Sequence, residues 1–230
     1  MIVSHHYRYI YIKTAKTAGT SIVTYLADQC VDGDLVTPLG KKDREEAAAA
    51  GYTTPHGIRT MLGNARFWLW QQPSAWAGKP VSKKNLKAED ASRFVGQKTW
   101  DSYYKFCFER NPYDKAVSLY YFHGRLFKQK MDINEYIINA NDRKLSNWYM
   151  YTINNEVAVD HIYRFENLES EMAAISQKFG LSLASLPRAK TSTNTKKEHY
   201  SKLINREARL RIEHACANEI EYMQYRWEQA

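Results

Sequence analysis

Cysteine is scarce in this chain, which holds only Cys30, Cys107 and Cys216 among its 230 residues. The three are far apart and include no C-x-x-C pair, which argues against a disulfide framework and against a zinc site. Cys107 lies in an apolar run and is expected to be a small core residue. Unpaired thiols fit a reducing compartment, so a cytoplasmic location is expected.

Long apolar runs are also missing. No segment approaches the roughly 18 consecutive apolar residues of a membrane-spanning helix, and the first eight residues contain no hydrophobic signal core. No Ser/Gly/Pro-rich linker and no internal repeat divides the chain. We therefore expect no membrane span and a single domain over 1–230, with an irregular, aromatic-rich insertion at about 52–84.

Acidic residues are outnumbered by basic ones. The chain has 25 Asp and Glu against 33 Lys and Arg, a formal net charge of +8. This excess points to anionic partners, but nucleic acid, a phosphorylated cofactor and an acidic polysaccharide all qualify, as does charge that serves only solubility. The 44% hydrophobic and 25% charged residues are typical of a soluble globular protein.

The first specific pattern begins at Tyr9. Tyr9–Ile12 predicts a buried strand, small and hydroxylated residues follow, and apolar residues return at helical spacing from Ser21 to about Gln29. A strand–loop–helix unit of this kind binds anions, because the first N–H groups of the helix are unpaired and the helix dipole adds positive charge there. Lys16 adds a full positive charge to this loop.

This loop lacks the signature of a nucleoside-triphosphate loop, which is G-x-x-x-x-G-K-[ST]. Lys16 precedes Gly19 by three residues, whereas the signature places its lysine directly after a glycine. We therefore expect the loop to hold an anionic group of a different donor. The alternative is an ordinary strand-to-helix turn with a surface lysine.

A second strand–loop–helix unit follows. Tyr104–Phe108 predicts a strand, Arg110 comes just after its end, Asn111-Pro112 signals a helix start, and Ser118 lies about two turns further on. Because ligands of open α/β sheets bind at the carboxyl ends of the strands, both units direct cations to one edge. Other helices are predicted over 88–95, 132–139, 168–179 and 205–225, with a strand over 157–165. The alternation predicts an α/β, P-loop-like three-layer fold with a central, mainly parallel sheet flanked by helices.

Two segments carry a family resemblance. Lys16–Ser21, KTAGTS, resembles the PKTAGTS phosphosulfate loop of sulfotransferases, and Arg110–Ser118, RNPYDKAVS, resembles their RNPYDRxxS segment, which binds a 3′-phosphate. The resemblance is greatest to the carbohydrate-type branch with small bacterial and viral members. It continues weakly through 100–106, 164–168 and 200–227, whereas about 32–80 has no clear counterpart.

The resemblance implies a donor, 3′-phosphoadenosine 5′-phosphosulfate (PAPS), whose sulfuryl group passes to an acceptor hydroxyl or amine, with a carbohydrate as the favoured acceptor. It implies that Lys16 is catalytic and stabilises the leaving group, and that Arg110 and Ser118 bind the 3′-phosphate, which ATP lacks. No metal is expected, because positioning and charge stabilisation carry such transfers. The other residues expected to bind the donor are Lys13, Thr17, Ala18, Gly19, Thr20, Ser21, Lys196 and Lys197.

Four positions depart from the family pattern, and the fourth, Asn85, bears on the catalytic base. Lys13 stands where the family commonly has histidine, and Ala15 where it has proline. The extra charge of Lys13 either strengthens anion binding or faces solvent. Glu109 replaces an apolar residue, and we expect it to hold Arg110 in place through an ion pair.

The resemblance assigns no catalytic base, because Asn85 stands where many relatives carry a histidine. His56, between a proline and a glycine, is the first candidate, since histidine titrates near neutral pH. The alternative for His56 is a loop histidine with no role. Weaker candidates for the base are Glu89, Asp90 and His123.

Two other classes of function remain as alternatives. A P-loop kinase or nucleotide hydrolase is disfavoured by the position of Lys16 and by the lack of a clear metal-binding aspartate after a strand. A nucleic-acid-binding module would explain the net charge of +8, but no aromatic-basic motif supports it. The sequence assigns no oligomeric state, and acceptor contacts are expected from the tryptophan-bearing segment at about 52–80.

Overall fold

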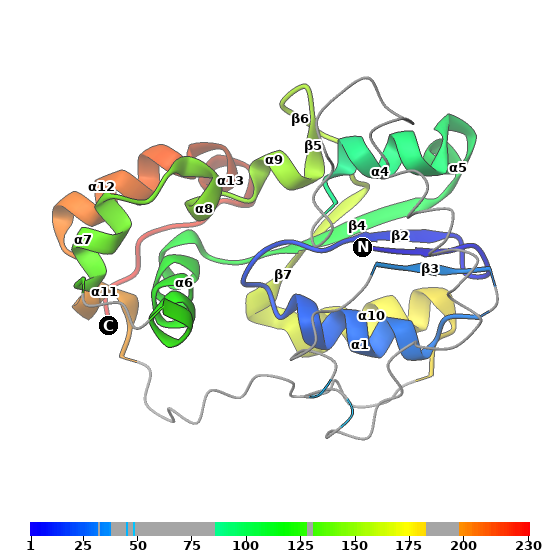
Figure 1. Ribbon diagram of the computed structural model, residues 1–230, viewed down its shortest axis with the longest axis horizontal. Coiled ribbons are helices and arrows are strands. Elements are labelled where there is room, and N and C mark those ends of the chain that lie inside the picture. The colour runs from blue at the N-terminus through cyan, green and yellow to red at the C-terminus, as the bar shows by residue number, and fades with distance from the viewer. Residues whose placement is uncertain (32, 38–44, 46–47, 49–85, 128–130, 183–197) are drawn as a thin grey trace.

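The computed structural model describes residues 1–31, 33–37, 45, 48, 86–127, 131–182 and 198–230. These residues form a three-layer α/β unit with a lobe of helices beside it (Figure 1). Helices α4 (Ala88–Val95) and α5 (Gln97–Ser102) cover one face of the sheet, and α1 (Gly19–Asp28) and α10 (Leu168–Phe179) cover the other. The predicted insertion at about 52–84 lies outside the described residues.

Within the described residues the central sheet has the strand order β3-β1-β2-β4-β7. β2 pairs in parallel with β4, and β4 pairs in parallel with β7, whereas β1 runs antiparallel to both β2 and β3. β1 is thus the one strand of this sheet that opposes the others, which confirms the predicted mainly parallel sheet. The strands are β1 (Ile2–Ser4), β2 (Tyr9–Ile12), β3 (Leu35–Val36), β4 (Tyr104–Glu109) and β7 (His161–Arg164).

The composition of β2 follows from helices on both faces of the sheet. Successive side chains of a strand point to opposite faces. Ile10 and Ile12 therefore pack against the α4 side with Trp100, while Tyr9 and Tyr11 pack against residues of α1 and α10. Because both faces are covered, the strand is apolar and aromatic throughout and does not alternate with polar residues.

The two helices on the α1 face are joined by a buried tyrosine. The Tyr25 hydroxyl of α1 lies 2.6 Å from the Ser176 hydroxyl of α10 and donates to the Ser182 carbonyl at 2.7 Å. α10 ends at Gly180, whose φ of 65° is the left-handed conformation that glycine adopts at low cost. The helices predicted over 168–179 and over 88–95 are both confirmed.

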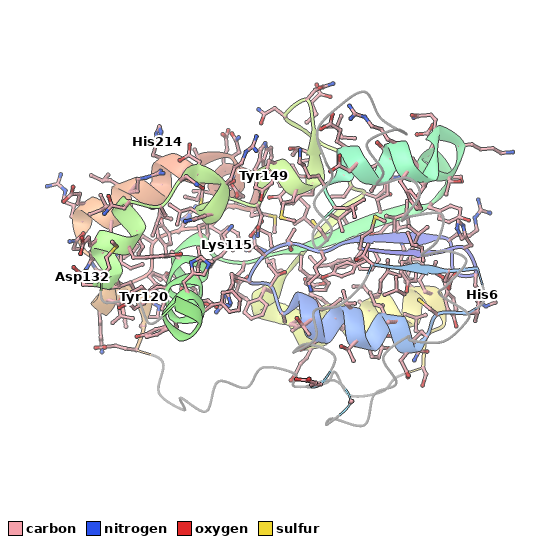
Figure 2. All side chains as sticks on the ribbon, viewed as in Figure 1. His6, Lys115, Tyr120, Asp132, Tyr149 and His214 are labelled. Carbon is pink, nitrogen blue, oxygen red and sulfur yellow. The ribbon has the colours of Figure 1, made fainter. Side chains whose placement is uncertain are left out.

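The helical lobe starts where β4 ends, at the carboxyl edge of the sheet. Its core includes Tyr113, Ile137 and Ile212, from three different helices. Figure 2 shows Lys115 on the inner side of the lobe, whereas Asp132 and His214 lie at its outer surface. The lobe contains α6 (Pro112–Phe127), α7 (Ile133–Ile138), α8 (Asp142–Leu145), α11 (Tyr200–Leu203), α12 (Arg206–Ala215) and α13 (Ala217–Met223). α9 (Trp148–Tyr151) follows α8 and packs Met150 and Tyr151 into the core on the α4 face of the sheet.

The strand predicted over 157–165 is only partly correct. Val157 belongs to β6 (Glu156–Val157), which forms a small hairpin with β5 (Thr152–Ile153), and β7 starts only at His161. The hairpin turn, Asn154-Asn155, has φ values of 51° and 66°, the left-handed pair that a two-residue turn requires. The turn pairs Val157 with Thr152 of β5, and residues 158–160 connect the hairpin to β7 of the central sheet.

The closing helix predicted over 205–225 is divided in two. Cys216, with φ of −113° and ψ of 23°, interrupts the helical path between α12 and α13. The break brings Glu219 of α13 into the interior, where it is fully buried. None of the helices in the described part of the chain has the length and apolar character of a membrane span.

Candidate functional site

The loop between β2 and α1 has an unusual backbone path. Lys16 and Ala18 have φ values of 63° and 55°, in the left-handed region that residues other than glycine rarely adopt. α1 begins directly afterwards at Gly19, two residues earlier than the sequence predicted, and Ala18 at its N-cap has no side-chain oxygen to cap it. The N–H groups of Gly19, Thr20 and Ser21 therefore start the helix without an intrahelical acceptor.

Lys13 packs closely against the start of α1. A Cβ added to Gly19 would lie 2.9 Å from both Cγ and Cε of Lys13 and 3.3 Å from the Thr14 carbonyl. Thr14 is itself held beneath the loop, because its hydroxyl lies 2.8 Å from that of Thr17 and donates to the Phe108 carbonyl of β4. The absent side chain at Gly19 thus lets Lys13 approach the helix N-terminus.

The Lys16 side chain reaches toward the second unit. Its ammonium nitrogen lies 4.1 Å from the centre of the Phe122 ring, on α6. A cation over an aromatic face is attracted by the ring quadrupole. Lys16 therefore stands between α1 and α6, the helices that follow the two predicted anion-binding loops.

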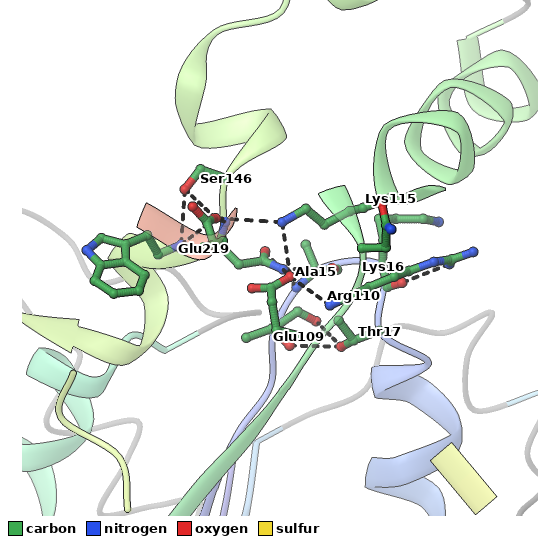
Figure 3. A network of polar contacts seen from close by, with 12 residues as sticks. Ala15, Lys16, Thr17, Glu109, Arg110, Lys115, Ser146 and Glu219 are labelled. Atoms are coloured by element: carbon green, nitrogen blue, oxygen red, sulfur yellow. Dashed lines mark hydrogen bonds and ion pairs between the residues drawn. The ribbon is translucent and has the colours of Figure 1, made fainter. Parts of the chain in front are cut away.

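Arg110 follows β4 and is 6% exposed. Its Nη1 donates to the Lys16 carbonyl at 3.1 Å, its Nε donates to Asp114 Oδ2 at 2.8 Å, and its guanidinium lies 4.2 Å from the centre of the Phe165 ring. These contacts fix the plane of the guanidinium and connect the two loops. Figure 3 shows Arg110 beside Lys16 at their junction.

The prediction of an ion pair between Glu109 and Arg110 is wrong. The contact from Arg110 to Glu109 Oε1 is made by the backbone N–H, at 2.9 Å, and not by the guanidinium, while Lys115 Nζ pairs with the same oxygen at 3.0 Å. The ion pair of Arg110 is instead with Asp114. Neighbouring side chains of an extended chain point to opposite sides, so Glu109 turns inward while Arg110 turns to the other side.

The predicted donor-binding residues gather around this junction where the structure describes them. Asp114 and Ser118 are four residues apart on α6, a spacing that places both on one side of the helix, and Arg110 contacts Asp114 from the segment just before α6. Ser118 is half-buried. Lys13, Lys16 and the residues from Thr17 to Ser21 belong to the β2–α1 loop and to the first turn of α1. The remaining predicted site residues, His56, Lys196 and Lys197, lie outside the described residues.

A buried ion cluster lies behind the loops, and the sequence prediction missed it. It consists of Lys115 of α6 with Glu109 of β4 and Glu219 of α13, all at most 2% exposed (Figure 3). Burial raises the pKa of Glu109. Burial also disfavours the charged form of Lys115, but Glu109 and Glu219 outweigh this and raise the pKa of the lysine above its ordinary value.

Two of the weaker candidates for the base are distinguished by their surroundings. The pKa of His123, on α6, is lowered by burial and further by the charges of Lys144 and Lys16, and its Nδ1 lies 2.5 Å from the Tyr136 hydroxyl. Glu89, by contrast, is engaged on the surface of α4 by Arg93 at 2.6 Å. Within the described residues no group of three His, Cys, Asp or Glu side chains has a metal-binding arrangement.

Two cationic loops thus lie side by side at the carboxyl edge of a mainly parallel sheet, and each leads into a helix. This is the architecture of an α/β protein that holds anionic groups. The model of the sulfotransferase family matches residues 1–226, and the chain therefore belongs to the sulfotransferase family. Family membership makes the protein a transferase of sulfuryl groups.

Two individual proteins are similar to this chain. An uncharacterized protein of Archaeoglobus fulgidus is 38% identical over 91 residues, which cover 38% of this chain and 76% of the relative. A sulfotransferase from Alicyclobacillus acidocaldarius, known from its crystal structure, matches with a TM-score of 0.47 and 13% identity over 93% of each chain.

Proposed function

We propose that the protein is a PAPS-dependent sulfotransferase that acts on an acceptor hydroxyl, or amine, of a carbohydrate. The observation that carries the proposal is the 3.1 Å hydrogen bond from Arg110 Nη1 to the Lys16 carbonyl, across a sequence separation of 94 residues. It brings together the loop proposed for the 5′-phosphosulfate and the segment proposed for the 3′-phosphate, the two anionic ends of one nucleotide.

The residues present fit a donor with two anionic groups. The N–H groups that begin α1, together with Lys13 and Lys16, are suited to the 5′-phosphosulfate. Arg110 has a planar guanidinium that binds a phosphate through two parallel bonds, and Ser118 adds a hydroxyl donor. We propose that Lys196 and Lys197 contact the same nucleotide.

When bound, PAPS supplies a sulfuryl group whose S–O bond to the phosphate breaks as the acceptor oxygen or nitrogen bonds to sulfur. Lys16 neutralises the negative charge that develops on the bridging oxygen. Contact with the Phe122 ring limits the positions open to the Lys16 ammonium, so little reorganisation accompanies the reaction. The cations of the loops supply the positive charge, and we propose that no metal is required.

We propose His56 as the base that accepts the acceptor proton, on the grounds given by the sequence. The structure adds a reason to test His123 beside it. Its pKa is lowered by burial and by nearby lysines, one of them Lys16, so its ring is neutral and able to accept a proton at pH 7.

The proposal extends to the domain organisation, the acceptor and the location of the protein. We propose that the chain acts as one domain over 1–230, which the family match over 1–226 supports. The aromatic-rich segment at about 52–84 is proposed to contact the acceptor, since aromatic rings stack on sugar faces and the net charge of +8 favours an acidic glycan. Three free cysteines support a cytoplasmic location.

The donor assignment predicts a preference that depends on the 3′-phosphate. Adenosine 3′,5′-bisphosphate, the expected product, should bind about 10- to 100-fold more tightly than adenosine 5′-monophosphate, because Arg110 gains a charge-assisted contact only with the former. Arg110→Lys keeps the charge but loses the planar fork, and should reduce this preference about tenfold. Calorimetric titration of both nucleotides into both proteins measures the preference.

The matched control is Arg93→Lys, because Arg93 lies on the surface of α4 in a pair with Glu89. This variant should keep the wild-type preference. Stronger thermal stabilisation of the wild type by ATP with Mg²⁺ than by the bisphosphate would instead support the kinase or hydrolase alternative.

The identity of the base predicts the pH dependence of two variants. A general base works only when deprotonated, so the wild-type rate should fall as the pH drops through the pKa of the base. His56→Ala should lower kcat by about 100-fold or more and remove this limb of the profile. His123→Ala should retain the wild-type kcat and the acidic limb of the profile. Loss of the acidic limb in His123→Ala alone would transfer the role to His123.

A further inference from the structure

Asn147 makes two hydrogen bonds to the backbone of the β2–α1 loop, the loop proposed to bind PAPS. Its Oδ1 accepts the N–H of Ala15 at 3.1 Å, and its Nδ2 donates to the Ala15 carbonyl at 3.1 Å. One side chain thus satisfies both polar groups of the residue that immediately precedes Lys16. The contact joins the N-terminal end of α9 to the loop after β2, across 132 positions of sequence.

The orientation of Asn147 is fixed by the buried ion cluster. Its backbone N–H donates to Glu219 Oε1 at 2.8 Å, and its Nδ2 donates to Glu109 Oε1 at 3.1 Å. Only one orientation of the amide provides an acceptor for the Ala15 N–H and donors for both the Ala15 carbonyl and Glu109. Asn147 is 1% exposed, so water does not compete for these bonds.

The same carboxylate oxygen also reaches the other loop. Glu109 Oε1 accepts the backbone N–H of Arg110 at 2.9 Å as well as the Nδ2 of Asn147. Lys115 holds that carboxylate from α6, at 3.0 Å. The cluster therefore connects the backbones of the two loops from behind, while the side chains of Lys16 and Arg110 lie on their other side (Figure 3).

We propose that Asn147 is a positioning residue for the transfer reaction, which holds the Ala15 backbone so that Lys16 keeps its left-handed conformation. A φ of 63° is uncommon for lysine and persists only where the surroundings impose it. Asn147 touches neither nucleotide nor acceptor and acts through Lys16. This inference rests on the proposed catalytic role of Lys16.

Asn147→Ala tests the proposal by the separation of turnover from binding. We expect kcat to fall about 100-fold, the size of effect that a misplacement of about 1 Å produces. The Kd of adenosine 3′,5′-bisphosphate should change less than about threefold, because Arg110 and Ser118 are unaltered. An equal loss in kcat and in binding, or a wild-type kcat, would overturn the positioning role.

The matched control is Asn134→Ala. Asn134 also clamps a backbone through both amide atoms, since it donates to the Leu203 carbonyl at 3.2 Å and accepts the Asn205 N–H at 2.8 Å. These bonds lie within the helical lobe, so kcat should stay at the wild-type value. A comparable loss of kcat in Asn134→Ala would show that loss of such a side-chain-to-backbone contact lowers turnover through reduced stability alone, and it would overturn the positioning role of Asn147.

Asn147→Asp serves if the alanine variant does not fold. At high pH the new carboxylate cannot donate to the Ala15 carbonyl and is repelled by Glu109 and Glu219, and this repulsion raises its pKa. Protonation restores an O–H donor, so the deficit in kcat relative to wild type should shrink as the pH falls from about 8 to 6. A profile parallel to that of the wild type would contradict the proposal.

Amide hydrogen exchange separates this inference from the proposed function. The Ala15 N–H is protected by Asn147 Oδ1, so exchange over residues 13–18 should accelerate in Asn147→Ala and remain unchanged in Asn134→Ala. This result does not require any transfer from PAPS. If exchange is faster in Asn147→Ala but the protein transfers no sulfuryl group, the proposed function is refuted and the contact of Asn147 with the Ala15 backbone is retained. Unchanged exchange would refute the role of Asn147 in holding that backbone.

Discussion

Replacement of Lys16 by alanine is expected to lower kcat for sulfuryl transfer by roughly 100- to 1,000-fold. In the proposed mechanism the ammonium neutralises charge on a bridging oxygen that becomes negative only as its bond to sulfur breaks, so the loss falls on the transition state. Adenosine 3′,5′-bisphosphate should bind the variant with a Kd within about tenfold of wild type, since Arg110, Ser118 and the N-terminus of α1 remain. Initial rates with labelled PAPS and calorimetric titration measure the two quantities.

Lys98→Ala provides the control for the change in charge. Lys98 is an exposed residue of α5, on the far side of α4 from the helical lobe, and its loss should leave both quantities unchanged (Figure 1). Turnover of Lys16→Ala at the wild-type rate would exclude Lys16 from catalysis. A parallel loss of turnover and of bisphosphate binding would make it a binding residue only.

Lys115→Met is expected to lower the free energy of unfolding by about 3–5 kcal/mol. Methionine fills a similar volume, but it leaves Glu109 and Glu219 as two buried carboxylates without their shared cation. The cost arises from that uncompensated charge, since the apolar part of the side chain is retained. Urea unfolding followed by circular dichroism measures it.

The stability deficit of Lys115→Met should depend on pH. Because the folded state raises the pKa of Lys115, its pairing with ionised Glu109 stabilises the fold below the ordinary lysine pKa and is lost as the pH rises through the folded value. Protonation of Glu109, whose pKa is also raised, removes the need for a cation, so the deficit of Lys115→Met should shrink as the pH falls.

Lys87→Met is the control for loss of a lysine from an ion pair, because its pair with Glu89 is 4.0 Å apart and about 40% exposed on the glutamate side. Lys87→Met should lower the free energy of unfolding by less than about 1 kcal/mol. If Lys115→Met were as mild as Lys87→Met, the cluster would not be the charged network that its distances indicate.

The local part of the fold was predictable from the sequence because its signals are short-ranged. Tyr9–Ile12 identified β2 by its apolar and aromatic side chains, and Gly180 marked the end of α10. Asp132 was predicted to open α7, and its carboxylate does cap the N–H of Asn134 and of Glu135. In each case the residues that specify the element are neighbours in the chain.

What the sequence did not yield depends on long-range packing. Nothing near Glu109 indicates that its partner is Lys115 and not Arg110, since that choice depends on which side of the strand faces the interior. Asn147 reaches Ala15 over 132 positions, and Glu219 becomes buried only because the chain turns at Cys216. Glu109, a charged residue that directly follows the apolar run Phe106–Phe108 at the end of β4, was the signal that could have indicated a buried cluster.

The ion pair between Arg110 and Asp114 has a consequence for the catalytic cycle. Asp114 already orders the guanidinium, so under the proposed function an arriving phosphate would not bear the entropic cost of fixing a long side chain. The same carboxylate also offsets part of the positive charge and would take the guanidinium back when the phosphate departs. Such an arrangement trades equilibrium affinity for rapid exchange, which suits the proposed PAPS-dependent enzyme, since it would release a spent nucleotide nearly identical to its donor before each new turnover.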